Sequence, residues 1–464
     1  MHSTTNTTPP TQHHAHKPHA HKPHALGVGH QVSLKGPERA EFGKPWHDCT
    51  VTVEPLHTDV LVIGAGPAGS AAAAWCARAG MDVLLADAEH FPRDKACGDG
   101  LTPRAILALR ELGMSDYLNT CAVNVGLRAA GFGQTLLLPW PGGKWPTTGG
   151  ASPRMRLDNA IHEVALAAGA RELPGARAID VTMNGDHIAA VTFRTEEGLR
   201  EVRARRVIVA DGAKSTLGRV LGRQWHRDTV YGVASRAYIS SDRHDDPWIS
   251  SHLELRDADG VLLSGYGWVF PLADGGVNIG VGTLATDKRP ANINLRTLLD
   301  TYVGQQRDDW KLQGDISNYA SRPLPMGGAV SNIAGPNWVM IGDAAACINP
   351  LNGEGIDYGL ETGRLAAIAL AEHSNLSRVW PQILHKEYGA AFSIARRLGD
   401  VLTLPGFLIK AGPIGMRSRW MMEIALRLMG NLVSDEDTDT IARLWRTAGS
   451  WSSRMDERAP FGVK

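Results

Sequence analysis

The sequence predicts a mixed α/β fold, and three observations support this. A short apolar run, a glycine turn, a small-residue helix and a second apolar run succeed one another between residues 58 and 87. The chain from about 230 to 282 is rich in strand-forming residues. After about residue 353 the pattern is mainly helical. The predicted fold is therefore a Rossmann-like domain interleaved with an antiparallel-sheet domain, followed by C-terminal helices.

Composition and charge exclude several classes of protein. Apolar residues make up 43% and charged residues 21%, which is ordinary for a globular protein. The 48 basic residues balance the 48 acidic ones, so we expect no nucleic acid partner. The cysteines are odd in number and widely separated, which favours reduced thiols in the cytoplasm over disulfides or a bound metal. These cysteines are Cys49, Cys76, Cys97, Cys121 and Cys347.

The pattern also predicts domain boundaries. Residues 1–55, with the near-repeat HAHKPHAHKPHA, are predicted to be a disordered histidine-rich tail. Metal capture by its imidazoles is the alternative to a simple solvated tail, which we favour. The cofactor domain is expected at 56–125, 150–228 and 320–375, the substrate-binding sheet domain at 126–149 and 229–319, and a helical region at 376–464.

The first elements follow one another closely. Asp59–Ile63 is a short apolar run typical of a buried strand, and it enters a glycine-rich turn. The small residues from Ser70 to Ala79 predict a helix that packs close to a sheet, and Gly80 ends it. Met81–Ala86 predicts the second strand. The two strands are expected to be parallel, because a helix connects them.

Later elements continue the alternation. Arg156–Ala168 predicts a helix, and Val181–Arg194 predicts a hairpin whose turn is Asn184-Gly185-Asp186. Arg206–Ala210 and Trp338–Ile341 are apolar runs that each enter a turn containing glycine and aspartate. Such runs are typical of buried strands.

The glycine turn has the pattern Gly64-x-Gly66-x-x-Gly69, directly after a strand and before a helix. In that setting the first glycine permits the turn, the second lets the backbone approach a pyrophosphate, and the third lets the helix pack on the sheet. The helix start, which includes Ala68, offers free N–H groups to phosphates. Asp87, at the end of the second strand, can accept ribose hydroxyls. The pattern predicts a dinucleotide without distinguishing NAD(P) from FAD.

Two further turns lie downstream. Asp211-Gly212 follows one predicted strand, and Gly342-Asp343 follows another. Each is a common turn when taken by itself. Gly353-Glu354-Gly355 then opens a helix, whose positive end would stabilise a negatively charged ligand.

Together with Arg93–Gly98, these motifs resemble the flavin site of the aromatic hydroxylase superfamily, which also contains flavin halogenases and geranylgeranyl reductases. The resemblance implies FAD as cofactor, with Asp343 at its ribityl chain or pyrophosphate and Gly353–Gly355 facing the ring. Arg154 matches the arginine that flanks FAD, whereas Arg219 lies one position later than in many hydroxylases. The implied cofactor residues are Gly64, Gly66, Ala68, Gly69, Asp87, Arg93, Lys95, Gly98, Arg154, Asp211, Gly212, Gly342, Asp343, Gly353 and Gly355.

A second hairpin distinguishes among members of this superfamily. Gly265–Pro271 predicts a strand, Asp274–Gly276 can turn the chain, and Val277–Gly282 can return as its partner. A core hairpin with aromatic packing is one interpretation. The other is the wall of an apolar substrate pocket, because alternation places three aromatic side chains on one face and small residues beside them. The pocket residues would be Tyr266, Trp268, Phe270, Gly280 and Gly282.

This hairpin is similar to the YxWxFP…GxG signature of the geranylgeranyl reductase family, and the halogenase signature WxWxIP is absent. The resemblance covers nearly the whole chain from Thr58 onward. It implies a FAD-dependent oxidoreductase that saturates one isoprene double bond of a polyprenyl tail. The implied substrate is menaquinone or another polyprenyl lipid, with geranylgeranyl diphosphate and its lipid conjugates as the main alternatives.

The implied reaction couples a hydride from the reduced flavin with a proton. Its transition state carries positive charge on carbon, which the faces of Tyr266 and Trp268 could stabilise. Cys97 is the general acid that the resemblance implies, although a small buried thiol is the simpler interpretation. Tyr266 or a bound water could serve instead. The electron donor stays open between NAD(P)H and a separate protein, because no second dinucleotide pattern is found.

Two other functions remain as alternatives. A flavin monooxygenase acting on an apolar substrate would consume oxygen, and a non-enzymatic scaffold would depend on the histidine-rich tail. Basic and apolar residues alternate between Arg396 and Arg427, which predicts either a helix pair over the FAD domain or a peripheral contact with a membrane. A membrane-dissolved substrate favours the second, on the inner face of the plasma membrane.

Overall fold

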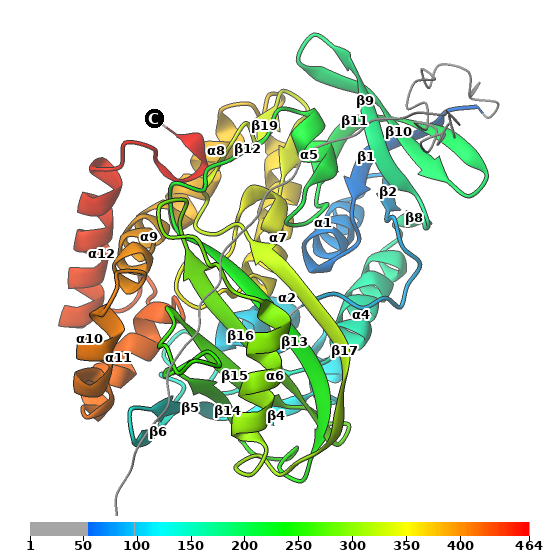
Figure 1. The fold of residues 1–464 in the computed structure, drawn as a ribbon. Coiled ribbons are helices and arrows are strands. Elements are labelled where there is room, and N and C mark those ends of the chain that lie inside the picture. The colour runs from blue at the N-terminus through cyan, green and yellow to red at the C-terminus, as the bar shows by residue number, and fades with distance from the viewer. Residues whose placement is uncertain (1–53, 97, 464) are drawn as a thin grey trace, which may run out of the picture. The chain divides into compact units, whose positions relative to one another are not determined.

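The computed structural model describes residues 54–96 and 98–463. The predicted tail of residues 1–55 lies outside the described residues except for its last two, and so does Cys97. Cys76, Cys121 and Cys347 are free thiols. The mixed α/β fold is confirmed, with two large sheets and a helical C-terminal region (Figure 1). The predicted domain boundaries stay a prediction.

The first sheet contains the predicted strand–helix–strand opening. Strand β1 pairs in parallel with β2 and with β11, and β11 pairs in parallel with β20. The predicted hairpin is β9 and β10, which extend antiparallel from β11. The strands are β1 (Leu56–Ile63), β2 (Val83–Ala86), β8 (Arg171–Leu173), β9 (Arg177–Asn184), β10 (His187–Thr195), β11 (Gly198–Val209), β19 (Ala334–Gly335) and β20 (Trp338–Met340).

Helix α1 packs against helix α7, as Figure 1 shows. The contact is close because Gly363 of α7 faces the backbone of α1 without a side chain. The helices outside the C-terminal region are α1 (Pro67–Arg78), α2 (Pro103–Glu111), α3 (Ser115–Leu118), α4 (Arg154–Ala167), α5 (Thr216–Val220), α6 (Leu295–Gln306) and α7 (Ile356–Glu372). Two short sheets complete this part, formed by β3 (Gly100–Leu101), β4 (Ala122–Asn124) and β7 (Gly149–Ala151), and by β12 (Gln224–Trp225) and β18 (Val330–Ser331).

The second sheet has the order β17-β13-β16-β15-β14-β5-β6. An antiparallel sheet was predicted, but β14 pairs with β5 in parallel. Helix α6 covers one face, where Tyr302 packs against Gly267 and Val269 is fully buried. The strands are β5 (Gly126–Gly131), β6 (Gln134–Pro139), β13 (Tyr231–Ser241), β14 (Trp248–His252), β15 (Gly265–Pro271), β16 (Gly276–Ala285) and β17 (Leu312–Leu324).

The C-terminal region is helical, as predicted. Met416 of α10 and Leu426 of α11 pack on Leu138 of β6, so these helices border the second sheet. Within residues 54–96 and 98–463, no helix has the length and apolar character needed to cross a bilayer. The helices are α8 (Val379–Leu384), α9 (Ala390–Leu402), α10 (Phe407–Met416), α11 (Arg419–Met429) and α12 (Thr440–Arg454), with short helical turns at Gly342–Ala345, His385–Gly389 and Pro460–Gly462.

Candidate active site

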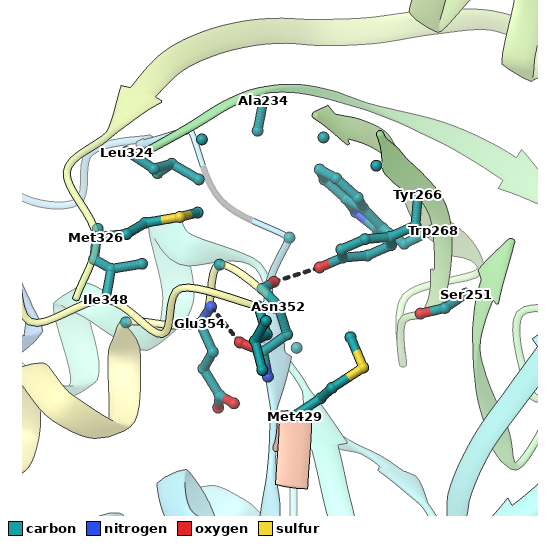
Figure 2. Close-up of a pocket in the computed structure, with 18 of the residues that line it drawn as sticks. Ala234, Ser251, Tyr266, Trp268, Leu324, Met326, Ile348, Asn352, Glu354 and Met429 are labelled. Carbon is teal, nitrogen blue, oxygen red and sulfur yellow. Dashed lines mark hydrogen bonds between the residues drawn. The ribbon is translucent and has the colours of Figure 1, made fainter. Parts of the chain in front are cut away.

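A cavity of about 460 Å³ lies where the glycine turns, the second sheet and helices α10 and α11 meet. Its volume is within the range of small-molecule sites. Figure 2 shows Tyr266 and Trp268 on one side and Leu324 and Met326 on the other. The cavity is the place where the predicted cofactor motifs and the predicted aromatic wall come together.

The first glycine turn has no room for a side chain at Gly64 or Gly69. A Cβ atom at Gly64, whose φ is +100°, would lie 2.4 Å from the carbonyl oxygen of Ala210. A Cβ atom at Gly69 would lie 1.7 Å from the carbonyl oxygen of Gly64. No side chain caps helix α1, so its first N–H groups remain available to an anion. Gly66 and Ala68 line the cavity beside them.

Asp87 and Asp211 hold the turns in shape. Oδ2 of Asp87 accepts a hydrogen bond from the backbone N–H of Ala65 at 2.6 Å. Asp211 accepts from Ser215 at 2.6 Å and from the N–H of Leu217 at 2.9 Å, at the start of α5. Neither carboxylate lines the large cavity, whereas Gly212 does. The predicted ribose contact of Asp87 stays a prediction, and Asp211 acts here as a support for its turn.

Cationic side chains surround the glycine turns. Arg154 pairs through two hydrogen bonds with the buried Asp158, at 2.6 and 2.7 Å, and Arg93 pairs with the same carboxylate at 3.0 Å. Nζ of Lys95 lies 3.9 Å from where a Cβ of Gly66 would stand and 3.6 Å from that of Gly212. These groups, the open helix end and the glycine cradle fit the pyrophosphate and ribityl parts of FAD.

Asp343 also lines the cavity, on the turn after β20. Arg322 of β17 donates a hydrogen bond to its carboxylate, and Lys95 lies 3.8 Å away. Burial by itself would raise the pKa of Asp343, but Lys95 and Arg322 lower it to about 2. Burial and Arg322 lower the pKa of Lys95 to about 8, which Asp343 opposes. Gly342, Gly353 and Gly355 complete this edge of the cavity.

The aromatic wall stands on β15, as predicted. The ring centroids of Tyr266 and Trp268 are 6.0 Å apart, and those of Trp268 and Phe270 are 6.3 Å apart. The hydroxyl of Tyr266 donates a hydrogen bond to the carbonyl oxygen of Asn352 (Figure 2). That proton is already engaged, which weakens the case for Tyr266 as the general acid.

The two pocket glycines have different roles, and the prediction for Gly280 is wrong. A Cβ at Gly280 would lie 2.1 Å from Cζ2 of Trp268, so this glycine makes room for the indole rather than for a ligand. Gly280 does not line the cavity, whereas Gly282 does. Gly98 lies beside the same rings, with its hypothetical Cβ 3.2 Å from Phe270. Cys97, the implied general acid, lies outside the described residues.

The sequence reasoning missed a hydrogen-bonded chain behind Trp268. The indole N–H of Trp268 donates to Oδ1 of Asn278 at 2.8 Å, and Nδ2 of Asn278 donates to Oδ2 of Asp99 at 2.9 Å. Asp99 is fully buried, and burial raises its pKa to about 7, against the effects of Asn278, Tyr238 and Arg236. In the sequence, only the position of Asp99 directly after Gly98 could have indicated that it lies at the site.

A second missed feature is a group of carboxylates at the start of α7. Glu354 lines the cavity between the two predicted glycines and accepts a hydrogen bond from the hydroxyl of Thr102 at 2.5 Å. Asp357 and Glu361 follow it, near Arg104 of α2. The glutamate within the glycine turn was visible in the sequence, but nothing there indicated its partners.

The far side of the cavity is apolar. Helices α10 and α11, the last residue of α9 and the tip of the β5–β6 hairpin contribute these side chains, and the ring of Phe132 fills the space above Gly412. The cavity therefore runs from a charged cofactor cradle to an apolar chamber. The apolar residues contributed there are Phe132, Leu402, Phe407, Leu408, Met416, Met422, Leu426 and Met429.

Comparisons with known proteins agree with this site. The FAD binding domain family matches residues 57–378. The menaquinone reductase of Mycolicibacterium smegmatis is 57% identical over 406 residues, which cover 87% of this chain and 98% of that protein. Digeranylgeranylglycerophospholipid reductase 1 of Methanopyrus kandleri is 30% identical over 359 residues, or 75% of this chain and 91% of that protein.

The fold is also similar to that of a solved geranylgeranyl bacteriochlorophyll reductase-like protein from Thermoplasma acidophilum. Its TM-score is 0.71 at 21% identity, covering 85% of this chain and all of that one. The predicted cofactor, FAD, is confirmed by the family match, which spans all three glycine turns. The chain therefore belongs to the FAD binding domain family.

Proposed function

We propose that this protein is a FAD-dependent oxidoreductase that saturates one isoprene double bond in the polyprenyl tail of menaquinone. The similarity to menaquinone reductases at 57% identity supports this substrate. The observation that carries the proposal is the continuous cavity, which joins the FAD cradle to an apolar chamber behind an aromatic wall. A long apolar tail could enter from the side of α10 and α11 and place one double bond at the cofactor.

The residues of the cavity suit this chemistry. FAD, when bound and reduced, supplies the hydride. Trp268 and Tyr266 line the cavity. Their ring faces would stabilise the positive charge that develops on carbon, by about 0.5–2 kcal/mol for each contact. Exclusion of water by the apolar walls strengthens these contacts. Asp99, through Asn278, keeps the indole of Trp268 in place.

A geranylgeranyl lipid is the second candidate substrate. The 30% identity to digeranylgeranylglycerophospholipid reductase 1 favours it specifically. Both candidates share the polyprenyl chain, and they differ in the head group that remains at the cavity mouth. A charged phosphate head would need cationic partners there, whereas a naphthoquinone would not.

We also propose that α10 and α11 contact the membrane surface in the cytoplasm. Five large apolar side chains are exposed on these helices, and exposed basic residues lie among them. This composition is typical of helices that lie in the headgroup region, next to anionic lipids. The apolar residues are Phe407, Ile409, Ile414, Trp420 and Met421, and the basic ones are Lys410, Arg417 and Arg419.

Cosedimentation with phosphatidylglycerol vesicles tests the membrane contact. The double variant Ile409→Asp, Ile414→Asp should lose most of its vesicle binding while keeping its FAD. The matched control is Met183→Asp, because Met183 is 42% exposed on β9 of the first sheet. Equal binding by all three proteins would contradict the proposal.

The reaction is tested by mass spectrometry on the products. The FAD-loaded protein, chemically reduced without oxygen, is given menaquinone or a geranylgeranyl lipid in separate reactions. A gain of two hydrogens in the menaquinone tail supports the proposal, and a gain only in the geranylgeranyl lipid supports the second candidate. A product that gains oxygen when air is admitted would replace both with a monooxygenase. The same assay, repeated with NAD(P)H in place of the chemical reductant, identifies the donor.

A further inference from the structure

Three carboxylates and one guanidinium gather beside the cavity, at the start of α7. The carboxylates are those of Glu354, Asp357 and Glu361, and the guanidinium is that of Arg104. Asp357 is fully buried, Arg104 is 8% exposed, and Glu354 is half-buried in the cavity wall. Such a group lacks the positive charge to balance three ionised carboxylates.

The guanidinium is committed to the two carboxylates farther along α7. Arg104 donates to both oxygens of Glu361, and its Nε lies 3.4 Å from Oδ2 of Asp357. Tyr388 adds a hydrogen bond to Glu361 at 2.9 Å. Glu354 forms no ion pair among the described residues, and its side chain is held by the Thr102 hydroxyl on Oε1. Its other oxygen, Oε2, is enclosed without a hydrogen-bond partner.

This arrangement favours a neutral Glu354. A buried carboxylate without a cation is costly, so the group holds a proton instead. Burial raises the pKa of Glu354 to about 7, against the opposing effects of Thr102 and Arg104, while Glu361 raises it further. Burial and the nearby Glu354 raise the pKa of Asp357 well above its usual value. Glu354 therefore changes its protonation near neutral pH, which suits a general acid.

We propose that Glu354 is the acid that supplies the proton for reduction of the double bond. The inference rests on the proposed function. The O–H bond of the Glu354 carboxyl breaks, and a C–H bond forms at one alkene carbon with the π electron pair. The other alkene carbon receives the hydride that reduced FAD supplies, so FAD is oxidised, the alkene is reduced and Glu354 is left as a carboxylate. Rotation about the side-chain bonds of Glu354 would turn the carboxyl toward the cavity, at the cost of its hydrogen bond with Thr102.

The other acids of the cavity are less suited to this role. Asp99 is fully buried, and its hydrogen bond to Asn278 ties it to the support of Trp268. The hydroxyl of Tyr266 gives its proton to Asn352. Glu354, by contrast, is half-buried in the cavity wall, on the turn that follows Asn352 (Figure 2), and its Oε2 has no hydrogen-bond partner.

The experiment compares Glu354→Gln with the wild-type chain and with Glu387→Gln, which removes an exposed carboxyl outside the cavity. Infrared difference spectra of the oxidised, FAD-loaded proteins are recorded during a pH titration. Wild type and the control should lose protonated-carboxyl absorption as the pH rises through about 7, and Glu354 and Asp99 should both contribute to it. In Glu354→Gln this absorption should be smaller by one carboxyl, with the Asp99 part retained. Absorption in that variant equal to that of wild type would overturn the inference.

Single-turnover rates with menaquinone form the second measurement. In wild type the rate should fall about tenfold per pH unit above the Glu354 pKa, because only the protonated carboxyl reacts. Glu354→Gln should be slower by about 10²–10⁴-fold, without this pH dependence. A rate within threefold of wild type, with the pH dependence retained, would overturn the inference.

A further variant guards against loss of folding in Glu354→Gln. Thr102→Val keeps the shape of the side chain but removes the hydrogen bond that favours the ionised form of Glu354. Both the infrared midpoint and the pH dependence should shift to higher pH, which a merely structural effect would not produce. If the wild-type chain forms no product with two added hydrogens, the proposed function fails as well. If it forms that product and the midpoint stays unchanged in Thr102→Val, only the inference about Glu354 fails.

Discussion

Trp268 takes its position in the cavity because Gly280, its partner across the β15–β16 pair, has no side chain. Gly282 is the partner of Tyr266 in the same pair and meets the indole only at ordinary contact distance, 3.5 Å from a hypothetical Cβ. Two glycines of one strand thus differ in function. One makes room for an aromatic ring, and the other borders the space that a ligand can occupy.

The two glycines should therefore respond differently to the same substitution. Gly280→Ala should destabilise the protein by about 1–3 kcal/mol, because the indole must move. Gly282→Ala should change the free energy of unfolding by less than that, because its Cβ meets no close atom. Urea unfolding of the FAD-free proteins measures both. Equal midpoints for the two variants would show that Trp268 does not depend on Gly280.

Lys95 should make FAD binding depend on pH. Its pKa of about 8 lies below the usual 10.5, so the side chain is charged below pH 8 and loses its charge above it. The negative pyrophosphate favours the charged form. Above pH 8 the free protein must therefore take up a proton to bind FAD, and affinity falls by up to tenfold per pH unit.

Flavin fluorescence titrations between pH 7 and 9.5 measure this effect. Lys95→Met should bind FAD more weakly at pH 7 and show a flatter profile. Lys288→Met, which changes an exposed lysine, should behave like wild type. A wild-type affinity that is constant across this pH range would refute the assignment of Lys95 to the phosphates.

Helices α1 and α7 illustrate how close approach of elements depends on single glycines. A Cβ at Gly363 of α7 would lie 2.7 Å from the carbonyl oxygen of Ala68 and 2.8 Å from the N atom of Ala72, both backbone atoms of α1. The positive end of α1 is thereby held beside the FAD cradle. Gly304 of α6, in contrast, has no atom within 4 Å of its hypothetical Cβ.

Alanine substitutions in the two helices should have opposite effects. Gly363→Ala should destabilise by about 1–3 kcal/mol and weaken FAD binding, because α1 must move away from α7. Gly304→Ala should stabilise by about 0.5–1 kcal/mol, because glycine is a poor helix former and the new methyl group meets nothing. Thermal unfolding, monitored by circular dichroism, checks both. A loss of stability in both variants would contradict the contact argument.

At the scale of the whole molecule, two arginines of the second sheet hold the loop that carries Lys95. Arg236 of β13 pairs with Asp94 and donates to the carbonyl oxygen of Lys95 at 2.9 Å. Arg322 of β17 donates to the carbonyl oxygen of Ala96 at 2.7 Å and also bonds Asp343. The second sheet and the loop that carries Lys95 are thus joined at the wall of the cavity.

Removing one of these links should affect both stability and cofactor binding. Arg236→Gln should lower the free energy of unfolding by up to about 3 kcal/mol. This is the lower end of the loss expected for a buried ion pair, because Asp94 is 33% exposed. The matched control is Arg171→Gln, whose pair with Asp82 is half-exposed on both sides and contributes about 1 kcal/mol or less. Urea unfolding and FAD titration measure the two effects. Similar losses in both variants would argue against a special role for Arg236.

Local spacing was sufficient to predict the elements that carry the first glycine turn and the aromatic strand. The strand, turn, helix and strand from Leu56 to Ala86 involve neighbours in the chain, and so does the alternation that puts Tyr266, Trp268 and Phe270 on one face. Their geometry depends on backbone sterics and on the strand repeat, both of which are encoded over a few residues.

The sequence by itself therefore determined the fold class, a dinucleotide-binding turn and the aromatic face of β15, and its resemblance to a known family implied FAD. Only the tertiary structure decided that Gly280 accommodates an indole, that Asp99 supports Asn278 across 179 residues, and that Glu354 meets Thr102 across 252. Those contacts join segments far apart in the chain, and no local pattern specifies which segments meet. Burial and charge at such junctions arise only after folding. The protonation of Glu354, which the proposed reaction requires, depends on both.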